Sequence, residues 1–183
     1  MFKLFTLIAI VLSIGFSGSV AAQDATQRTK DLVAALDKTK YKKKEKANVS
    51  IEVFVDIKNE AVTKNDRSEY SGLYEVDGYK LDLRVANDGS AASSGFDSSA
   101  NGDKPVNFTL KNAKIDGALL TATKVYDNGK EQPLEAVFVN RNARAGSNPK
   151  VVSVDVTQFG LGFIQPGSDA NDNWTNRVFL EKK

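Results

Sequence analysis

The side chains most often used in catalysis are missing from this chain, because its 183 residues include neither histidine nor cysteine. Imidazole is the usual general base of serine hydrolases, and thiolates are common enzymatic nucleophiles. Both groups are also the main protein ligands of zinc. The composition therefore excludes serine–histidine triads, thiol catalysis, zinc sites built from these residues and disulfide chemistry within the chain.

Acid–base chemistry would have to come from carboxylates, lysines and tyrosines. A facing pair of carboxylates could hydrolyse a glycosidic bond, and the acids on or beside expected strands are Glu69, Glu75, Asp82, Glu135 and Asp155. Asp82 alternates with leucines and should face water, and Glu135 and Asp155 share this outward phase. No catalytic motif is found, and we expect the protein not to be an enzyme.

A dense group of oxygen ligands lies near the end of the sequence. Asp169, Asn171 and Asn173 match the spacing at the start of a calcium-binding loop. The glycine that should follow is Trp174, however, and the glutamate expected at the twelfth position is Leu180. The pattern favours a polar turn. No metal or cofactor is expected, and calcium binding by residues 169–173 is left open.

The most unusual local pattern is Phe-Gly-Leu-Gly-Phe at residues 159–163. On a strand it places three large side chains on one face and none on the other, which indicates close approach of another group to the glycines. One interpretation is the floor of a small apolar pocket, and the other is a barrel bend or the crossing of a large side chain such as Trp174. The pocket hypothesis has these lining residues, which are otherwise ordinary core: Tyr70, Tyr74, Phe138, Phe159, Gly160, Gly162, Phe163 and Trp174.

Residues 37–46 contain six lysines and two acids. One interpretation is a basic arm that binds an anionic surface such as phosphate, lipopolysaccharide or another polymer. The other is a solvated last helical turn and linker, whose lysines complement the helix C-terminus. The arm hypothesis assigns binding to Lys38, Lys40, Lys42, Lys43, Lys44 and Lys46.

These groups must be positioned mainly by strands, because the hydrophobic period changes to two after Asn48. The strongest strand alternates Val49, Ile51, Val53, Val55 and Ile57 with more polar neighbours. Asp-Gly and Asn-Gly pairs supply tight turns, and Asn112 is a candidate bulge. A loop is expected at residues 141–149. The predicted strands span residues 49–57, 69–76, 79–85, 90–96, 108–115, 119–126, 134–140, 152–156, 159–164 and 174–180.

The spacing of turns predicts a mainly β, antiparallel, up-and-down small barrel with one N-terminal helix, and a two-sheet sandwich is the alternative. Residues 70–95 combine tyrosine, glycine, alternating leucines and Asp88-Gly89. In this rhythm the segment resembles lipocalin- and avidin-like barrels, and Asn173-Trp174-Thr175 is faintly similar to them too. The resemblance implies architecture only.

The N-terminus has the layout of a secretory signal peptide, with Lys3, an uncharged apolar run at residues 4–16 and small residues up to Ala22. We therefore expect residues 1–22 to be a signal peptide, residues 23–47 a helix with a basic linker, and residues 48–183 one antiparallel β domain. The helix is expected from Asp24, in a capping box with Gln27, to about Lys46. Its apolar patch is Leu32, Val33 and Leu36.

Together these features predict an exported, non-catalytic barrel protein located in the periplasm or outside the cell. Loss of Lys3 lowers the formal net charge of +2 by one, and this near-balance favours no nucleic-acid partner. No segment after the leader is long and apolar enough to span a bilayer. The expected partner is a small apolar ligand, or alternatively an anionic envelope surface bound by the lysine-rich arm; the oligomeric state is left open.

Overall fold

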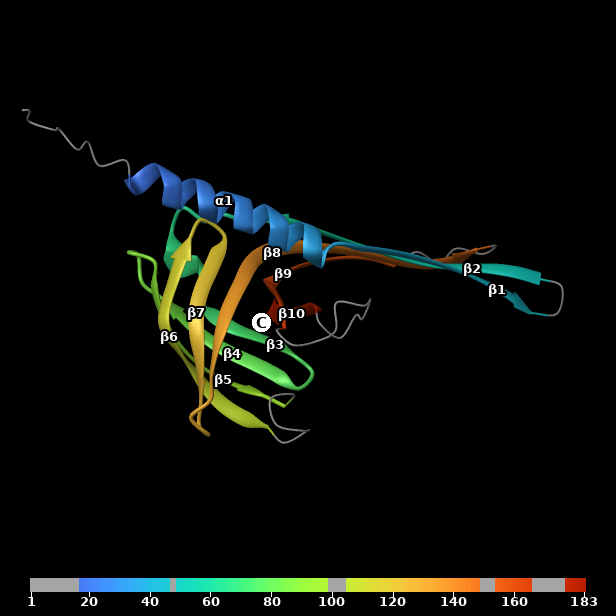
Figure 1. Cartoon of the computed structure of the whole chain (residues 1–183). Helices are drawn as coiled ribbons and strands as arrows, with labels where there is room; N and C mark the ends of the chain where they lie inside the picture. Colours follow the sequence, from blue (N-terminus) through green and yellow to red (C-terminus); the bar gives the residue numbers. More distant parts are fainter. Residues whose placement is uncertain (1–16, 47–48, 99–104, 149–153, 166–176) are drawn as a thin grey trace, which may run out of the picture.

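The computed structural model describes residues 17–46, 49–98, 105–148, 154–165 and 177–183 (Figure 1). It contains a closed barrel of eight antiparallel strands preceded by one helix. The predicted barrel is thus confirmed, and the alternative of a two-sheet sandwich is wrong. None of the helices in the described part of the chain has the length and apolar composition needed to cross a bilayer.

The chain forms one α-helix, one 3-10 helix and ten strands in its described part. They are α1 (Ser17–Leu36), β1 (Lys38–Lys46), β2 (Val49–Ala61), the 3-10 helix η1 (Arg67–Tyr70), β3 (Gly72–Val76), β4 (Tyr79–Val85), β5 (Ser90–Asp97), β6 (Val106–Asp116), β7 (Leu119–Tyr126), β8 (Glu131–Asn148), β9 (Val154–Ile164) and β10 (Arg177–Lys182).

The barrel is built by neighbours in sequence. Strands β3 to β8 form an antiparallel meander, β8 pairs with β9, β9 with β10, and β10 closes the ring against β3. Closure gives each barrel strand a hydrogen-bonded neighbour on both sides, which removes the exposed edges that an open sheet would have.

The turn chemistry behaves as expected from the sequence. Gly78, Gly89, Gly117 and Gly129 all have positive φ, between 59° and 86°, which glycine adopts without steric cost. Asn112 has φ of 55°, and the register of β6 against β7 shifts between Lys111 and Lys114. The predicted bulge at Asn112 is therefore confirmed.

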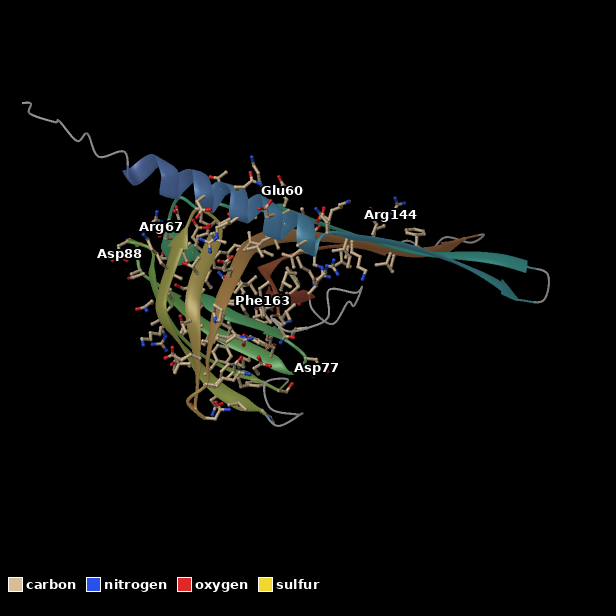
Figure 2. The ribbon with its side chains drawn as sticks, in the orientation of Figure 1. Glu60, Arg67, Asp77, Asp88, Arg144 and Phe163 are labelled. Carbon is tan, nitrogen blue, oxygen red and sulfur yellow. The ribbon has the colours of Figure 1, made fainter. Side chains whose placement is uncertain are left out.

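The barrel interior is filled by its own side chains. Tyr74, Leu81, Phe108, Leu120, Phe138, Leu161 and Leu180, from seven different strands, are each at most 1% exposed. Figure 2 shows Phe163 among them, inside the ring of strands. Burial of this aromatic and aliphatic surface is the main force that holds the ring together.

A second, smaller core lies on the outer wall of the barrel, under α1 (Figure 1). Leu36 of the helix packs with Val137, Val139 and Phe179, and Leu32 and Val33 extend the contact. Arg28 pairs with Glu135 farther along the helix. The apolar patch predicted on this helix therefore docks it on the barrel.

The helix is shorter at its C-terminal end than the sequence predicts. It ends at Leu36, and the lysine-rich residues expected as a last turn and linker form strand β1, paired with β2 along its whole length. The chain changes from helix to strand at Asp37. The Oδ1 of Asp37 accepts hydrogen bonds from the backbone N–H (2.7 Å) and the Nδ2 (3.2 Å) of Asn59, which tie this point to β2. Pairing with a strongly β-forming partner overrides local helix propensity here.

Strand β8 is longer than expected, because residues 141–148, predicted as a loop, continue it between β2 and β9. Likewise, residues 154–164 form the single strand β9, where two strands were predicted. We call the part that projects beyond the barrel the wing (Figure 1). It consists of β1, residues 49–57 of β2, residues 141–148 of β8 and residues 154–158 of β9.

Candidate functional site

One end of the barrel interior holds most of the aromatic residues predicted to line a pocket. The Tyr70 ring stacks on Phe138 with centroids 4.1 Å apart, and the Phe159 ring also stacks on Phe138, with centroids 6.4 Å apart. Tyr74 lies 5.9 Å from Phe138 and donates a 2.6 Å hydrogen bond to the Tyr70 carbonyl. These rings pack against one another as core, and their role in ligand binding stays a hypothesis.

The Tyr70 hydroxyl fastens two loops at this end. It accepts a hydrogen bond from the Lys64 N–H (2.8 Å) and shares its proton between the carbonyl oxygens of Val62 (2.9 Å) and Gly117 (3.0 Å). The phenol is therefore fully engaged by the protein's own backbone, and burial raises its pKa. Such a group serves structure well but leaves little capacity for a ligand.

The two glycines of β9 face the outer wall. A Cβ at Gly160 would lie 2.7 Å from the Phe179 ring, and one at Gly162 would lie 2.5 Å from a methyl group of Leu36. The glycines thus admit Phe179 and α1, as in the interpretation that a large side chain crosses them. Trp174, which the sequence suggested for that crossing, lies outside the described residues, as do residues 169–173 of the oxygen cluster.

The other end of the interior contains a buried lysine that sequence reasoning missed. Lys124 is 1% exposed, and its ammonium lies 3.7 Å from the Asp97 carboxylate. Four aromatic rings surround the ammonium, with centroids 5.4–5.7 Å away: Tyr79, Phe108, Tyr126 and Phe163. The signal was present in the sequence, because Lys124 occupies an inward position in the alternation of β7.

The four rings form a cage around the Lys124 ammonium, in which burial and pairing with Asp97 shift the pKa of the lysine in opposite directions. Burial lowers the pKa of Lys124, and the nearby Asp97 charge works against that effect. Burial also raises the pKa of Tyr79 and of Tyr126, with the Asp97 charge adding to both. The Tyr126 hydroxyl contacts Asp97 at 3.2 Å and Gln132 at 2.9 Å. The cage holds a cation of its own, which occupies the place an external ammonium would need.

The cavities on the outside of the barrel are shallow and are lined by both polar and apolar groups. One cavity of about 340 Å³ lies between the first half of α1, Thr63 and the turn at Gly117. A second, of about 540 Å³, is lined by Arg141, Phe179, Glu75, Glu181 and Lys183, with the Arg141 guanidinium 4.7 Å from the Phe179 ring centroid. In the described ranges, no group of three or more acidic side chains is placed to hold a metal ion.

The wing places the lysine-rich segment in a regular row. Lys38, Lys40, Lys42, Lys44 and Lys46 occupy alternate positions of β1, and Lys43 lies between two of them, opposite Glu52. Each of the five pairs in register with one apolar residue of β2: Ile57, Val55, Val53, Ile51 and Val49. Directly opposite residues of an antiparallel pair share a face of the sheet. The lysine row therefore borders an apolar row on one face of the wing.

The apolar row continues onto the neighbouring strands. Val55 pairs with Ala145 and Ile57 with Ala143 of β8, and these two alanines pair with Val154 and Val156 of β9. We call the resulting surface the apolar face; its members are Val49, Ile51, Val53, Val55, Ile57, Ala143, Ala145, Val154 and Val156.

Exposure of the apolar face differs between its strands. Ile57 of β2 is 6% exposed, whereas Val156 of β9, at the same level of the wing, is 39% exposed, and Ala145 of β8 is also exposed.

The opposite face of the wing carries polar groups and an aromatic pair. Asp56 lies opposite Arg144, labelled in Figure 2, and Thr157 donates a 2.7 Å hydrogen bond to Asn142. Phe54 pairs in register with Tyr41, and the Arg144 guanidinium lies 5.7 Å from the Phe54 ring centroid. The wing is thus a sheet with one aliphatic face, which a row of lysines borders.

No protein-family model, curated protein or solved structure matches this chain.

Proposed function

We propose that this protein is an exported, non-catalytic binding protein whose barrel is a scaffold and whose wing binds an anionic surface. The single observation that carries the proposal is the row of lysines at alternate positions of β1, which is paired with β2 and projects beyond the barrel; four of the five follow Lys38, whose ammonium is buried at the base of the row. A regular cationic row on a projecting sheet presents its charge to a partner before the rest of the protein reaches it.

The filled interior supports a scaffold role for the barrel. Four of the aromatic residues assigned to a pocket pack on one another: Tyr70, Tyr74, Phe138 and Phe159. Tyr70 and Tyr74 also use their hydroxyls on backbone groups. A small apolar ligand would have to displace this packing. The wing, in contrast, projects beyond the barrel, so binding there requires no rearrangement of the main core.

Export is consistent with the way α1 is docked. The helix runs across the expected cleavage point before Gln23. Its contacts with the barrel come from Arg28, Leu32, Val33 and Leu36, all of which follow that point. Removal of residues 1–22 would therefore leave the docking contacts in place. N-terminal sequencing of material recovered from outside the cytoplasm should begin at Gln23, and an intact leader on that material would contradict export by cleavage.

The test of the proposal is retention on immobilised dextran sulfate at increasing salt. The variant Lys40→Gln, Lys42→Gln, Lys44→Gln, Lys46→Gln should elute at clearly lower salt than wild type, because the row of charges is lost. The matched control removes the same number of charges, at exposed positions of the helix and barrel: Lys30→Gln, Lys111→Gln, Lys114→Gln, Lys130→Gln. Equal losses in the two variants would mean that only net charge matters and would refute a role for the wing.

A further inference from the structure

We infer that the anionic surface bound by the wing is a lipid bilayer, with the lysine row over the lipid phosphates and the apolar face at the boundary of the acyl chains. This inference rests on the proposed function, since it names the class of partner for the same surface. It adds a role for the apolar face, which the binding of a soluble polyanion does not require.

The apolar face is uniform in composition. Its nine members are valine, isoleucine or alanine, and no charged residue interrupts them in the register of β2, β8 and β9. Asp56 and Arg144 lie on the opposite face, whereas the lysines of β1 border the apolar face. An apolar surface bordered by lysines is typical of elements that lie in a membrane interface.

Part of the apolar face is exposed. In the described part of the chain, Val76 and Val156 are the large hydrophobic side chains with the greatest exposure, at 45% and 39%. Val156 belongs to the apolar face and has Ala145 exposed nearby, whereas Val76 stands at a barrel turn. A grouped apolar surface indicates a binding site, while a single exposed valine needs no explanation.

The lysine row follows a single extended strand, β1. Alternate residues of a strand are about 7 Å apart, so the four lysines beyond Lys38 span roughly 20 Å along a nearly straight line. A straight row of that length matches a planar array of phosphate groups. A lysine next to apolar residues can also bury its methylene stem in the interface while its ammonium reaches the phosphate layer.

Charge argues against a second copy of the chain as the occupant. Edge-to-edge pairing through β1 would bring two lysine rows together, and like charges directly opposite each other destabilise a sheet. Lysines on an edge strand are a common means of preventing such pairing. An anionic lipid surface satisfies both the charge and the apolar face at once.

Vesicle flotation separates lipid binding from binding to charge alone. Wild type should float with vesicles of phosphatidylcholine and phosphatidylglycerol and not with phosphatidylcholine alone. The lysine variant should bind the anionic vesicles on the order of 100-fold more weakly. Val55→Thr with Val156→Thr preserves shape and β propensity and should weaken vesicle binding about tenfold, with retention on dextran sulfate unchanged. The matched control is Val76→Thr with Val125→Thr, which should behave as wild type.

The cysteine-free chain allows a direct measure of depth. An environment-sensitive fluorophore on Val156→Cys should brighten and shift to the blue with anionic vesicles, whereas the same label on Thr157→Cys, on the opposite face, should not. Equal responses, or wild-type vesicle binding by the valine double variant, would overturn the lipid inference and leave the proposed function standing.

The remaining outcomes distinguish failure of the proposed function from failure of the lipid inference. Unchanged binding of the lysine variant to both dextran sulfate and vesicles would refute the proposed function itself. Retention on dextran sulfate without flotation would refute only the lipid inference. Sedimentation that shows a dimer lost in the valine double variant, with no flotation, would assign the apolar face to a second copy instead. Circular dichroism of each variant checks that the fold is retained.

Discussion

At the scale of single residues, the pairing of Lys124 with Asp97 is the most demanding feature of the fold. Both are almost fully buried, and the surrounding rings of Tyr79, Phe108 and Phe163 supply the only kind of apolar wall that attracts a cation. Taking such a pair out of water is expensive unless the geometry compensates. The pair therefore acts to fix how the strands at this end of the barrel pack together.

Removal of one partner of the Lys124–Asp97 pair should destabilise the fold. Lys124→Met leaves the Asp97 carboxylate buried without the neighbouring ammonium and should lower the free energy of unfolding by about 3–5 kcal/mol. Lys124→Met with Asp97→Asn should recover much of this loss. Urea unfolding measures both, and a double variant as unstable as the single one would show that the pair is not coupled.

Alkaline pH should destabilise the protein through its buried tyrosines. Burial raises the pKa of Tyr74, Tyr79 and Tyr126 above the ordinary value of 10.0. Above that pH the unfolded chain releases phenol protons that the folded chain retains, so the stability from these groups, fully present below pH 10, falls as pH rises. Lys124 acts in the opposite sense up to 10.5, because its lowered pKa lets the folded chain release its proton first.

The measurement for this prediction is a titration of phenolate absorbance alongside unfolding. Tyr74, Tyr79 and Tyr126 should ionise only as the fold is lost, in one cooperative step. Gradual ionisation of all the tyrosines near their ordinary pKa, with the β-sheet signal intact, would contradict the burial of these hydroxyls.

At the scale of elements, docking of α1 depends on a missing side chain at Gly162. A Cβ there would meet only the flexible end of Leu36. Gly162→Ala should therefore destabilise the protein by about 1–3 kcal/mol, and Leu36→Ala by about 2–4 kcal/mol. The double variant should lose less than the sum, because the shortened Leu36 makes room for the new methyl group.

Gly160 supplies the control for that coupling. A Cβ at Gly160 would meet the Leu180 carbonyl and the Phe179 ring, not Leu36. Gly160→Ala should therefore be destabilising whether or not Leu36 is shortened. Thermal unfolding of the three single variants and of the two double variants with Leu36→Ala decides the matter, and strictly additive losses for Gly162→Ala with Leu36→Ala would disprove the contact.

The elements also show where sequence reasoning succeeds and where it stops. Alternation within β2 and β4, and the Asp-Gly and Asn-Gly turns, were readable because they depend on near neighbours. Strand β1 and the extension of β8 were not, because lysine-rich and polar segments become strands only through partners distant in the sequence. The lysines were singled out in advance, but their alignment with the apolar residues of β2 required the register.

At the scale of the whole molecule, the barrel and the wing divide the work of stability and recognition. The barrel contains the main core, while the wing extends two barrel strands, β8 and β9, beyond that core and adds the β1–β2 hairpin at one edge (Figure 1). A sheet anchored in this way can present a surface at a distance without depending on a core of its own.

Shortening of the hairpin tests that division. Lys40 and Val55 are partners in register, so replacement of residues 41–54 by Asn-Gly joins them through a two-residue turn. The shortened protein should unfold within about 1 kcal/mol of wild type, because surface changes outside the core have small effects. It should also lose retention on dextran sulfate. Collapse of the barrel fold, shown by circular dichroism, would mean that the hairpin is part of the scaffold.

Hydrogen exchange with and without anionic vesicles tests the central claim most directly, because it reports on every part of the protein at once. If the wing is the binding surface, added protection should be confined to β1, β2 and the distal parts of β8 and β9, with the barrel strands β3 to β7 unchanged. Protection centred on the barrel, with no change in the wing, would contradict the account.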